Sequence, residues 1–282
     1  MEISRTALPH GTPPTSDDLR AAARRARGRV FSVAKGGRRW VVKQAVPGRD
    51  RIRAWGGSLL GRLMMGYWLP RAPLRLGGER QLRYEAARLR ELRAEGEPVP
   101  EVARVGSDFL VLEHGGEPLW HRIRHAAFPD LQPILMDVSR DLARFHAAGH
   151  WHGGAQLRNY LVADDSDALV RIDFEEPLDE MMPLAARQAM DLYLLVHSVT
   201  AFKTPTEREL ALLCRAVIEA YLQARSPDAG MLAYVERAQA VLNFVERWPV
   251  RLFSGTGKDL RRMLLTVAAM DAVMAPGLRR GR

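Results

Sequence analysis

Four polar residues stand in this chain in an order that suits the binding of phosphate groups and a divalent cation. Lys43 follows the alternating apolar residues 40–42, so we expect it at the end of a strand. Glu85 lies on the helix expected next, Asn159 directly precedes a short strand, and Asp173 ends the strand after that. Phosphoryl transfer depends on positioned phosphates and neutralised charge. A lysine with an acidic partner would orient the phosphates, and amide and carboxylate oxygens are suitable Mg²⁺ ligands.

Each of these residues also has a plainer interpretation. Exposed lysines are common on strands, and Glu85 fits equally well on the surface of an arginine-rich helix. Asn159 and Asp173 fit a loop residue and a strand-end capping residue. Their common order along the chain favours the chemical interpretation. Asn159 and Asp173 flank a single expected hairpin, so both could face one cation.

Apolar spacing and turn residues predict the elements that position the first two side chains. We expect a basic helix capped by Ser16 or Asp17, a hairpin, a long helix that ends before Gly96, and a second hairpin. The expected residues are 18–27 for the basic helix, 30–34 and 39–44 for the first hairpin, 79–95 for the long helix, and 102–105 and 109–112 for the second hairpin.

From about residue 130 onward the chain is expected to be mostly helical, so the whole chain predicts an α+β fold. Thr204 resembles a helix N-cap, with proline at the first helical position and glutamate at the third. The expected elements are a helix at 130–148, strands at 160–163 and 169–173, and helices that begin near Ala185, at Thr204 and near Pro227.

Several stretches carry a resemblance to known kinases. They are Tyr84-Glu85-Ala with the residues up to Pro98-Val99-Pro100, the run from Phe109 to Gly116, the loop 146–159, and the run 190–195. From Val30 to about Ala201, the chain resembles the small atypical kinases, namely the lipopolysaccharide Kdo kinases and the kinase of the KEOPS tRNA-modification complex.

The resemblance implies a bilobal protein-kinase-like fold that works with ATP and Mg²⁺. The small β-rich N-lobe would be 16–115 with an insert at 49–78, the helical C-lobe 116–282, and residues 1–15 a disordered N-terminus. The implied site has an ion pair, Lys43 and Glu85, and two metal ligands, Asn159 and Asp173. It also has the hinge residues Glu113 and Gly115 beside adenine, and Asp191, which would brace the catalytic loop. In that loop we expect His152 to hold the backbone by a hydrogen bond.

Two departures from the family pattern leave the activity open. The catalytic loop of the family reads His-x-Asp, whereas here it reads His152-Gly153-Gly154, so glycine stands where the base is expected. Gln156, Glu175 or Glu176 could replace it, Glu175 could also bind metal, or the chain could bind nucleotide without transferring phosphate. In addition, no full glycine-rich loop precedes Lys43.

Composition bounds the function further. The formal charge of +9 favours anionic partners, although the arginine excess also fits a GC-rich genome. One cysteine excludes an internal disulfide and a zinc–thiolate cluster. No apolar run is long enough to predict a signal peptide or a membrane span. A cytoplasmic location follows as the expectation, with peripheral attachment to the inner membrane.

Residues 51–78 form a segment with five arginines and no acid. Trp55, Tyr67 and Trp68 recur with leucines and methionines at helical spacing, a composition typical of a helix on anionic lipid. The same stripe could instead pack on the N-lobe.

These observations predict an ATP-dependent phosphotransferase. The acceptor would be a hydroxyl of a sugar, a lipid-linked sugar or another membrane-borne small molecule. The alternative is a pseudokinase that binds nucleotide or lipid. A tRNA-associated role ranks last, because no groove-reading motif or stacking platform is present, and nucleic acid is a disfavoured partner.

Overall fold

The computed structural model describes residues 12–45, 78–180 and 182–247, and helical stretches at 261–262, 265–266, 268–270 and 272–273. The described residues divide into two compact units. The smaller unit contains those up to Gly115, and the larger unit contains those from Gly116 onward. The expected lipid-binding segment 51–78 lies outside the described residues except for Gly78, and so do residues 1–11 of the expected disordered N-terminus.

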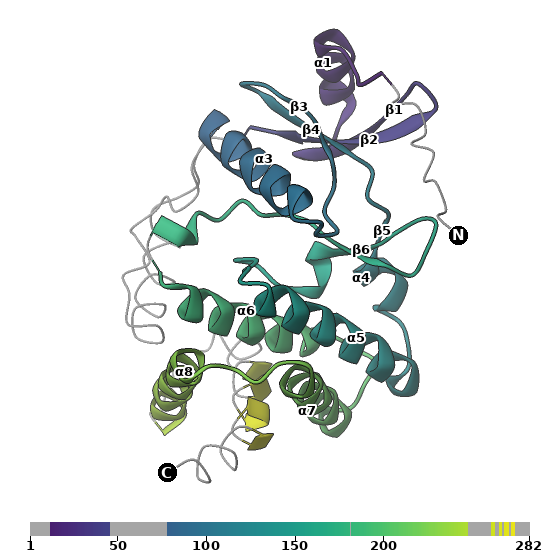
Figure 1. Ribbon diagram of the computed structural model, residues 1–282. Coiled ribbons are helices and arrows are strands. Elements are labelled where there is room, and N and C mark those ends of the chain that lie inside the picture. The colour runs from purple at the N-terminus through teal and green to yellow at the C-terminus, as the bar shows by residue number, and fades with distance from the viewer. Residues whose placement is uncertain are drawn as a thin grey trace, which may run out of the picture. The chain divides into compact units, whose positions relative to one another are not determined.

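The smaller unit is a four-stranded antiparallel sheet with two helices. The strand order is β1-β2-β4-β3, so the second hairpin adds β4 beside β2. Helix α3 packs against β3 and β4, and α1 packs against β1 (Figure 1). The elements are α1 (Ser16–Arg25), β1 (Val30–Lys35), β2 (Arg38–Gln44), α3 (Glu79–Ala94), β3 (Val102–Val105) and β4 (Phe109–Glu113).

Side-chain alternation along β2 separates the two faces of this sheet. Trp40 and Val42 point to the same face and form a buried cluster with Leu19 of α1 and Val111 of β4. Because successive side chains of a strand point to opposite faces, Lys43 points to the other face. Helix α3 covers that face with side chains at helical spacing, and the buried ones are Gln81, Leu82, Glu85, Ala86, Leu89 and Leu92.

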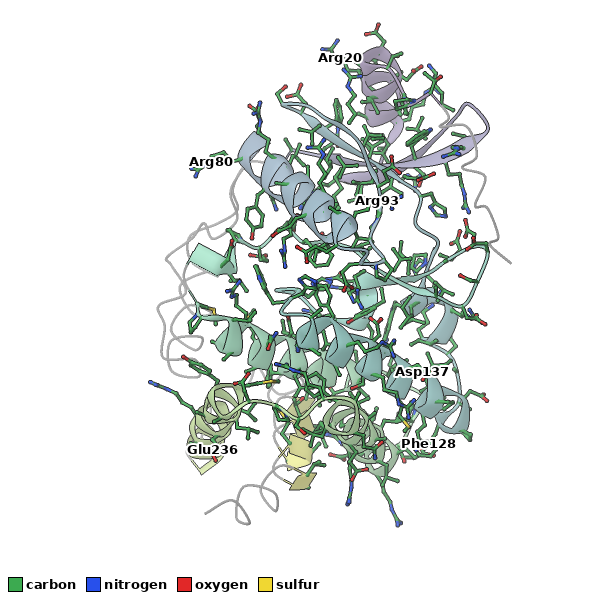
Figure 2. The ribbon with its side chains drawn as sticks, viewed as in Figure 1. Arg20, Arg80, Arg93, Phe128, Asp137 and Glu236 are labelled. Atoms are coloured by element: carbon green, nitrogen blue, oxygen red, sulfur yellow. The ribbon has the colours of Figure 1, made fainter. Side chains whose placement is uncertain are left out.

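Long arginine side chains cover the outer surfaces of the two helices in the smaller unit. Figure 2 shows Arg20 on α1 and Arg80 near the start of α3, each pointing away from its helix. Both residues are exposed. The charge excess noted in the sequence is therefore carried in part by solvated side chains of this unit.

The larger unit is helical and holds one small antiparallel sheet, ordered β5-β6-β7. Helix α5 packs against α7, and α6 packs against α7 and α8 (Figure 1). The elements are β5 (Glu117–Pro118), α4 (Leu119–Ile123), α5 (Phe128–Ala147), the 3₁₀ turn η1 (Leu157–Asn159), β6 (Tyr160–Val162), β7 (Leu169–Arg171), the 3₁₀ turn η2 (Leu178–Glu180), α6 (Leu184–Val199), α7 (Glu207–Ala224) and α8 (Ala229–Arg247).

The structure confirms the predicted fold class. The chain is α+β, with a small unit built on a four-stranded antiparallel sheet and a larger, mainly helical unit. Helix α4 and strand β5 were not predicted, since both are too short to show a period. In the part of the chain that the structure describes, none of the helices has both the length and the apolar character that a membrane crossing needs.

Two predicted helix starts were wrong. Helix α7 is capped by Thr206 and not by Thr204: the hydroxyl of Thr206 accepts from the backbone N–H of Glu209, and the Glu209 carboxylate accepts from the backbone N–H of Thr206. Thr15 caps α1 by the same reciprocal arrangement with Asp18, in place of Ser16 or Asp17. Pro205 therefore precedes the α7 cap and does not occupy the first helical position.

Candidate functional site

Lys43 and Glu85 form a buried ion pair in the smaller unit. Lys43 Nζ lies 2.5 Å from Glu85 Oε1, and the side chains are 7% and 0% exposed. Glu85 is therefore not a surface residue of an arginine-rich helix. A buried charge without a partner would cost several kcal/mol, roughly 3–5. The pair thus ties α3 to β2 and fixes the direction of the lysine.

The expected hinge residues, Glu113 and Gly115, lie at the end of β4 and just after it. Glu113 is the last residue of β4, and its carboxylate accepts from Arg38 of β2 at 2.7 Å. The backbone N–H groups of Glu113 and His114 donate to Glu101 O and Arg39 O. Glu113 therefore pairs with protein groups through both its side chain and its N–H, and Gly115 follows it as a half-buried residue.

In the larger unit, helix α6 holds the loop that follows α5. The buried Asp191 carboxylate accepts from the backbone N–H of His152 at 2.6 Å and from that of Gly153 at 2.8 Å. Gln188, on the same helix, donates to the carbonyl oxygens of His146 and His150. These four bonds fix the backbone at the start of the loop, so Asp191 contacts the segment that it was expected to brace.

His152 contributes to the loop through a backbone hydrogen bond, and its ring contributes by packing. Its backbone N–H is bonded, but its ring nitrogens have no hydrogen-bond partner among the described residues. The ring stacks on Phe174 with 4.4 Å between centroids. Burial lowers the pKa of His152 to about 4. The side chain is thus a neutral packing group, and the polar contact of this residue comes from its backbone.

Asn159 and Asp173 lie next to each other at one end of the β6–β7 hairpin. The backbone N–H of Ile172 donates to Asn159 O at 3.0 Å, which places Asn159 opposite the residue before Asp173. Asn159 Nδ2 donates to Gly154 O at 2.8 Å. Because this bond uses the amide donor, Oδ1 remains as the acceptor, which is the atom a cation requires.

Two acidic side chains complete this oxygen-rich end of the hairpin. A carboxylate oxygen of Asp173 and one of Glu175 lie within 4.8 Å of each other, a separation that one divalent ion can bridge. Asp173 has a φ of 74°, in the left-handed region, and strand β7 ends two residues before it, at Arg171. The donor set of an amide oxygen and two carboxylates fits Mg²⁺.

The two loop glycines, Gly153 and Gly154, differ in backbone conformation and in the space around their Cα atoms. Gly153 has a φ of 83°, and an added Cβ would lie 2.8 Å from Trp151 Cζ3. Gly154 has no positive φ, and an added Cβ would meet only Asn159 Nδ2 at 3.4 Å and His152 Nδ1 at 3.8 Å. Backbone geometry therefore demands glycine at position 153 and leaves room for a side chain at position 154.

Three other residues were expected as a possible replacement for the base: Gln156, Glu175 and Glu176. Gln156 precedes the η1 turn and is half-buried, as is Glu176, while Glu175 is 5% exposed. Gln156 contacts Asn159 through its backbone. Its backbone carbonyl accepts from Asn159 N at 2.8 Å, so it supports the turn that presents Asn159.

Sequence reasoning missed two buried polar groups that support this loop. Arg171 is 2% exposed, lies 2.8 Å from Asp141 Oδ2, and stacks over Phe145 with 4.3 Å to the ring centroid. His146 contacts Tyr221 and Asp191. Their partners lie 26 to 75 residues away in sequence, so local spacing carries no signal for them.

Comparison with known proteins gives likenesses among solved structures. No protein-family model and no curated protein sequence matches the chain. The chain is similar to a solved structure of an aminoglycoside-3′-phosphotransferase of type VIII, with a TM-score of 0.42 and 17% sequence identity over 80% of this chain and 98% of that one.

Proposed function

We propose that the chain is an ATP-dependent phosphotransferase. The observation that carries this is the pairing of Asn159 and Asp173 at one hairpin end, beside a loop whose backbone is fixed by Asp191. The backbone of Asp173 lies in a strained region, and the amide of Asn159 is held by Gly154 O. Backbone strain of this kind clusters at functional sites.

Each residue has a role in the proposed reaction. Asn159 and Asp173, with Glu175 beside them, would hold Mg²⁺, which neutralises charge on the phosphates. Lys43, held by Glu85, would orient the phosphates. Backbone groups at Glu113 and Gly115 would meet the adenine. Asp191 keeps the loop in place, and His152 packs beneath it.

The proposal also includes the class of the phosphate acceptor. We propose a hydroxyl of a sugar, a lipid-linked sugar or another membrane-borne small molecule. The sequence resemblance to lipopolysaccharide Kdo kinases and the basic, aromatic segment 51–78 support this class. A labelled product in lipid extract after incubation with γ-labelled ATP would identify it. Label that remains only in ATP and inorganic phosphate would count against it.

Nucleotide titration calorimetry tests the proposed site. Wild type should bind ATP with Mg²⁺ at least tenfold more tightly than without it, and Asp173→Asn should lose that difference. Asparagine tolerates the left-handed backbone and has nearly the same shape, so the variant removes the charge and little else. The matched control is Asp165→Asn, an exposed acid on the turn of the same hairpin. Unchanged Mg²⁺-dependent affinity in Asp173→Asn would refute the metal assignment.

A second candidate is a module that binds nucleotide without transferring phosphate. Glycine at position 154, in the place of the expected base, favours it. Mg²⁺-dependent ATP binding together with no ADP release and no labelled acceptor would support this function. Slow ADP release that disappears in Asp173→Asn would support the phosphotransferase.

A further inference from the structure

We propose that Tyr221 is a positioning residue, which sets the orientation of Asp191 through His146 and thereby holds the loop backbone at residues 152–153. The geometric part of this inference stands by itself. Its consequence for phosphate transfer rests on the proposed function. Three helices of the larger unit, α5, α6 and α7, contribute to the connection.

The connection is a continuous chain of buried contacts. Tyr221 Oη of α7 lies 2.6 Å from His146 Nδ1 of α5, and His146 Nε2 lies 3.4 Å from Asp191 Oδ2 of α6. Asp191 then accepts from two backbone N–H groups of the loop. His146 and Asp191 are fully enclosed, with side chains 0% exposed. No solvent competes for these groups, so each must be satisfied by its protein neighbours.

The contacts fix the positions of the protons. If His146 Nε2 lacked a proton, its lone pair would face the Asp191 carboxylate, which is repulsive at 3.4 Å. His146 therefore carries its proton on Nε2 and donates to Asp191. Burial lowers the pKa of His146, so the ring is neutral and Nδ1 accepts. The proton in the 2.6 Å contact must then come from the hydroxyl of Tyr221.

Contacts at the α7–α8 junction support a hydrogen bond donated by Tyr221 to His146. Arg225 Nη1 donates to Tyr221 Oη at 3.0 Å and approaches Met231 Sδ at 3.9 Å. Tyr221 Oη also lies 3.7 Å from Met231 Sδ, which is a weak acceptor. His146 Nδ1, at 2.6 Å, is the nearer and stronger acceptor, so the proton of Tyr221 is directed to His146. Burial raises the pKa of Tyr221 to about 12, so that proton stays on the oxygen. The tyrosine hydroxyl thus stabilises the same tautomer of His146 that Asp191 favours, in which Nε2–H donates to the Asp191 carboxylate.

The Tyr221 hydroxyl makes the hydrogen bond to His146, and it can be removed without removing the ring. Tyr221→Phe keeps the ring that packs edge-on against His146, at 5.6 Å between centroids. Without the hydroxyl, His146 Nδ1 loses its donor and the preference for the Nε2-protonated form weakens. The carboxylate of Asp191 then loses one of its three donors, and the loop backbone is held less firmly.

Nuclear magnetic resonance of the imidazole nitrogens tests the proton positions directly. Wild type should show the Nε2–H tautomer of His146, and Tyr221→Phe should show a mixed tautomer or a protonated ring. Exchange of the backbone amide hydrogens of His152 and Gly153 should become about tenfold faster, as expected for the loss of one hydrogen bond. The control Tyr193→Phe removes a hydroxyl from a half-buried tyrosine that stacks on another histidine, His197, and should change neither.

ADP release from Mg²⁺-ATP tests the functional consequence. Tyr221→Phe should lower kcat about tenfold, with KM for ATP changed less than twofold, because the hydroxyl acts on the loop and not on the nucleotide. Unchanged His146 nitrogen shifts and unchanged exchange at His152 and Gly153 would overturn the inference. If wild type fails to bind ATP at all, the proposed function fails, while the resonance and exchange data still decide this inference. Should Tyr221→Phe not fold, the nitrogen shifts of wild type alone decide the tautomer.

Discussion

Among the described residues, Asp173 alone has a positive φ without being glycine, at 74°. Such a backbone costs on the order of 1–3 kcal/mol for a residue with a side chain and persists only where the surroundings impose it. Aspartate is one of the few residue types that tolerate it. Strand β7 ends at Arg171, two residues before Asp173, and the left-handed backbone of Asp173 does not continue it. The predicted strand end at Asp173 was wrong for this reason, since alternation alone cannot show a change of φ.

The two loop glycines give a prediction about single side chains. Gly154→Ala should leave the free energy of unfolding unchanged or raise it by about 0.5–1 kcal/mol, because alanine restricts the unfolded chain at a compatible backbone. Gly153→Ala should lower it by about 1–3 kcal/mol, because its φ is 83° and its Cβ would meet Trp151. Urea denaturation measures both. Equal effects at the two positions would contradict the geometry.

The space at position 154 also allows a prediction about activity. Gly154→Asp places an acid where the family pattern has its base, and a positioned base contributes roughly 10²-fold or more. ADP release should rise by that order if the chain transfers phosphate and lacks a base. The variant Gly154→Asn, similar in size but without charge, is the control and should show no increase.

At the scale of elements, the sequence predicted the helices and strands better than their ends. Alternation over residues 40–42 placed Lys43 correctly at a strand end, and helical spacing placed Glu85 on the long helix, because both signals are local. The start of α7 was ambiguous, since Thr204 with Glu207 and Thr206 with Glu209 both match a capping box. Only the folded chain decides between two overlapping patterns. The contact between His146 and Tyr221 joins residues 75 positions apart and has no local signal at all.

The α7 cap can be tested with a pair of matched variants. Thr206→Ala removes the hydroxyl that accepts from Glu209 N and should lower the free energy of unfolding by about 1 kcal/mol. Thr204→Ala changes an exposed threonine outside the helix and should have an effect below about 0.5 kcal/mol. Urea denaturation compares the two. A larger loss in Thr204→Ala would restore the start of the helix that the sequence favoured.

At the scale of the whole molecule, buried histidines make stability depend on pH. Burial lowers the pKa of His146, and it lowers that of His152 from 6.5 to about 4. Both rings are therefore neutral in the folded chain, whereas in the unfolded chain they take up protons near pH 6.5. Below that pH the unfolded state binds more protons than the folded state, so the free energy of unfolding falls as the pH falls. Well above pH 6.5, where both states are neutral, neither histidine contributes a pH dependence.

The free energy of unfolding should therefore be flat from pH 8 to about 7 and then decline toward pH 4. His152 alone should account for a loss of about 3 kcal/mol between pH 7 and pH 4, from the shift of its pKa to about 4. Urea denaturation at intervals of half a pH unit measures the curve. His152→Phe keeps a ring to stack on Phe174 and removes the titrating group, so its decline should be shallower by up to about 1.4 kcal/mol per pH unit. His121→Gln, an exposed histidine of α4, should retain the slope of wild type. Parallel curves for wild type and His152→Phe would show that this ring does not remain neutral in the folded protein.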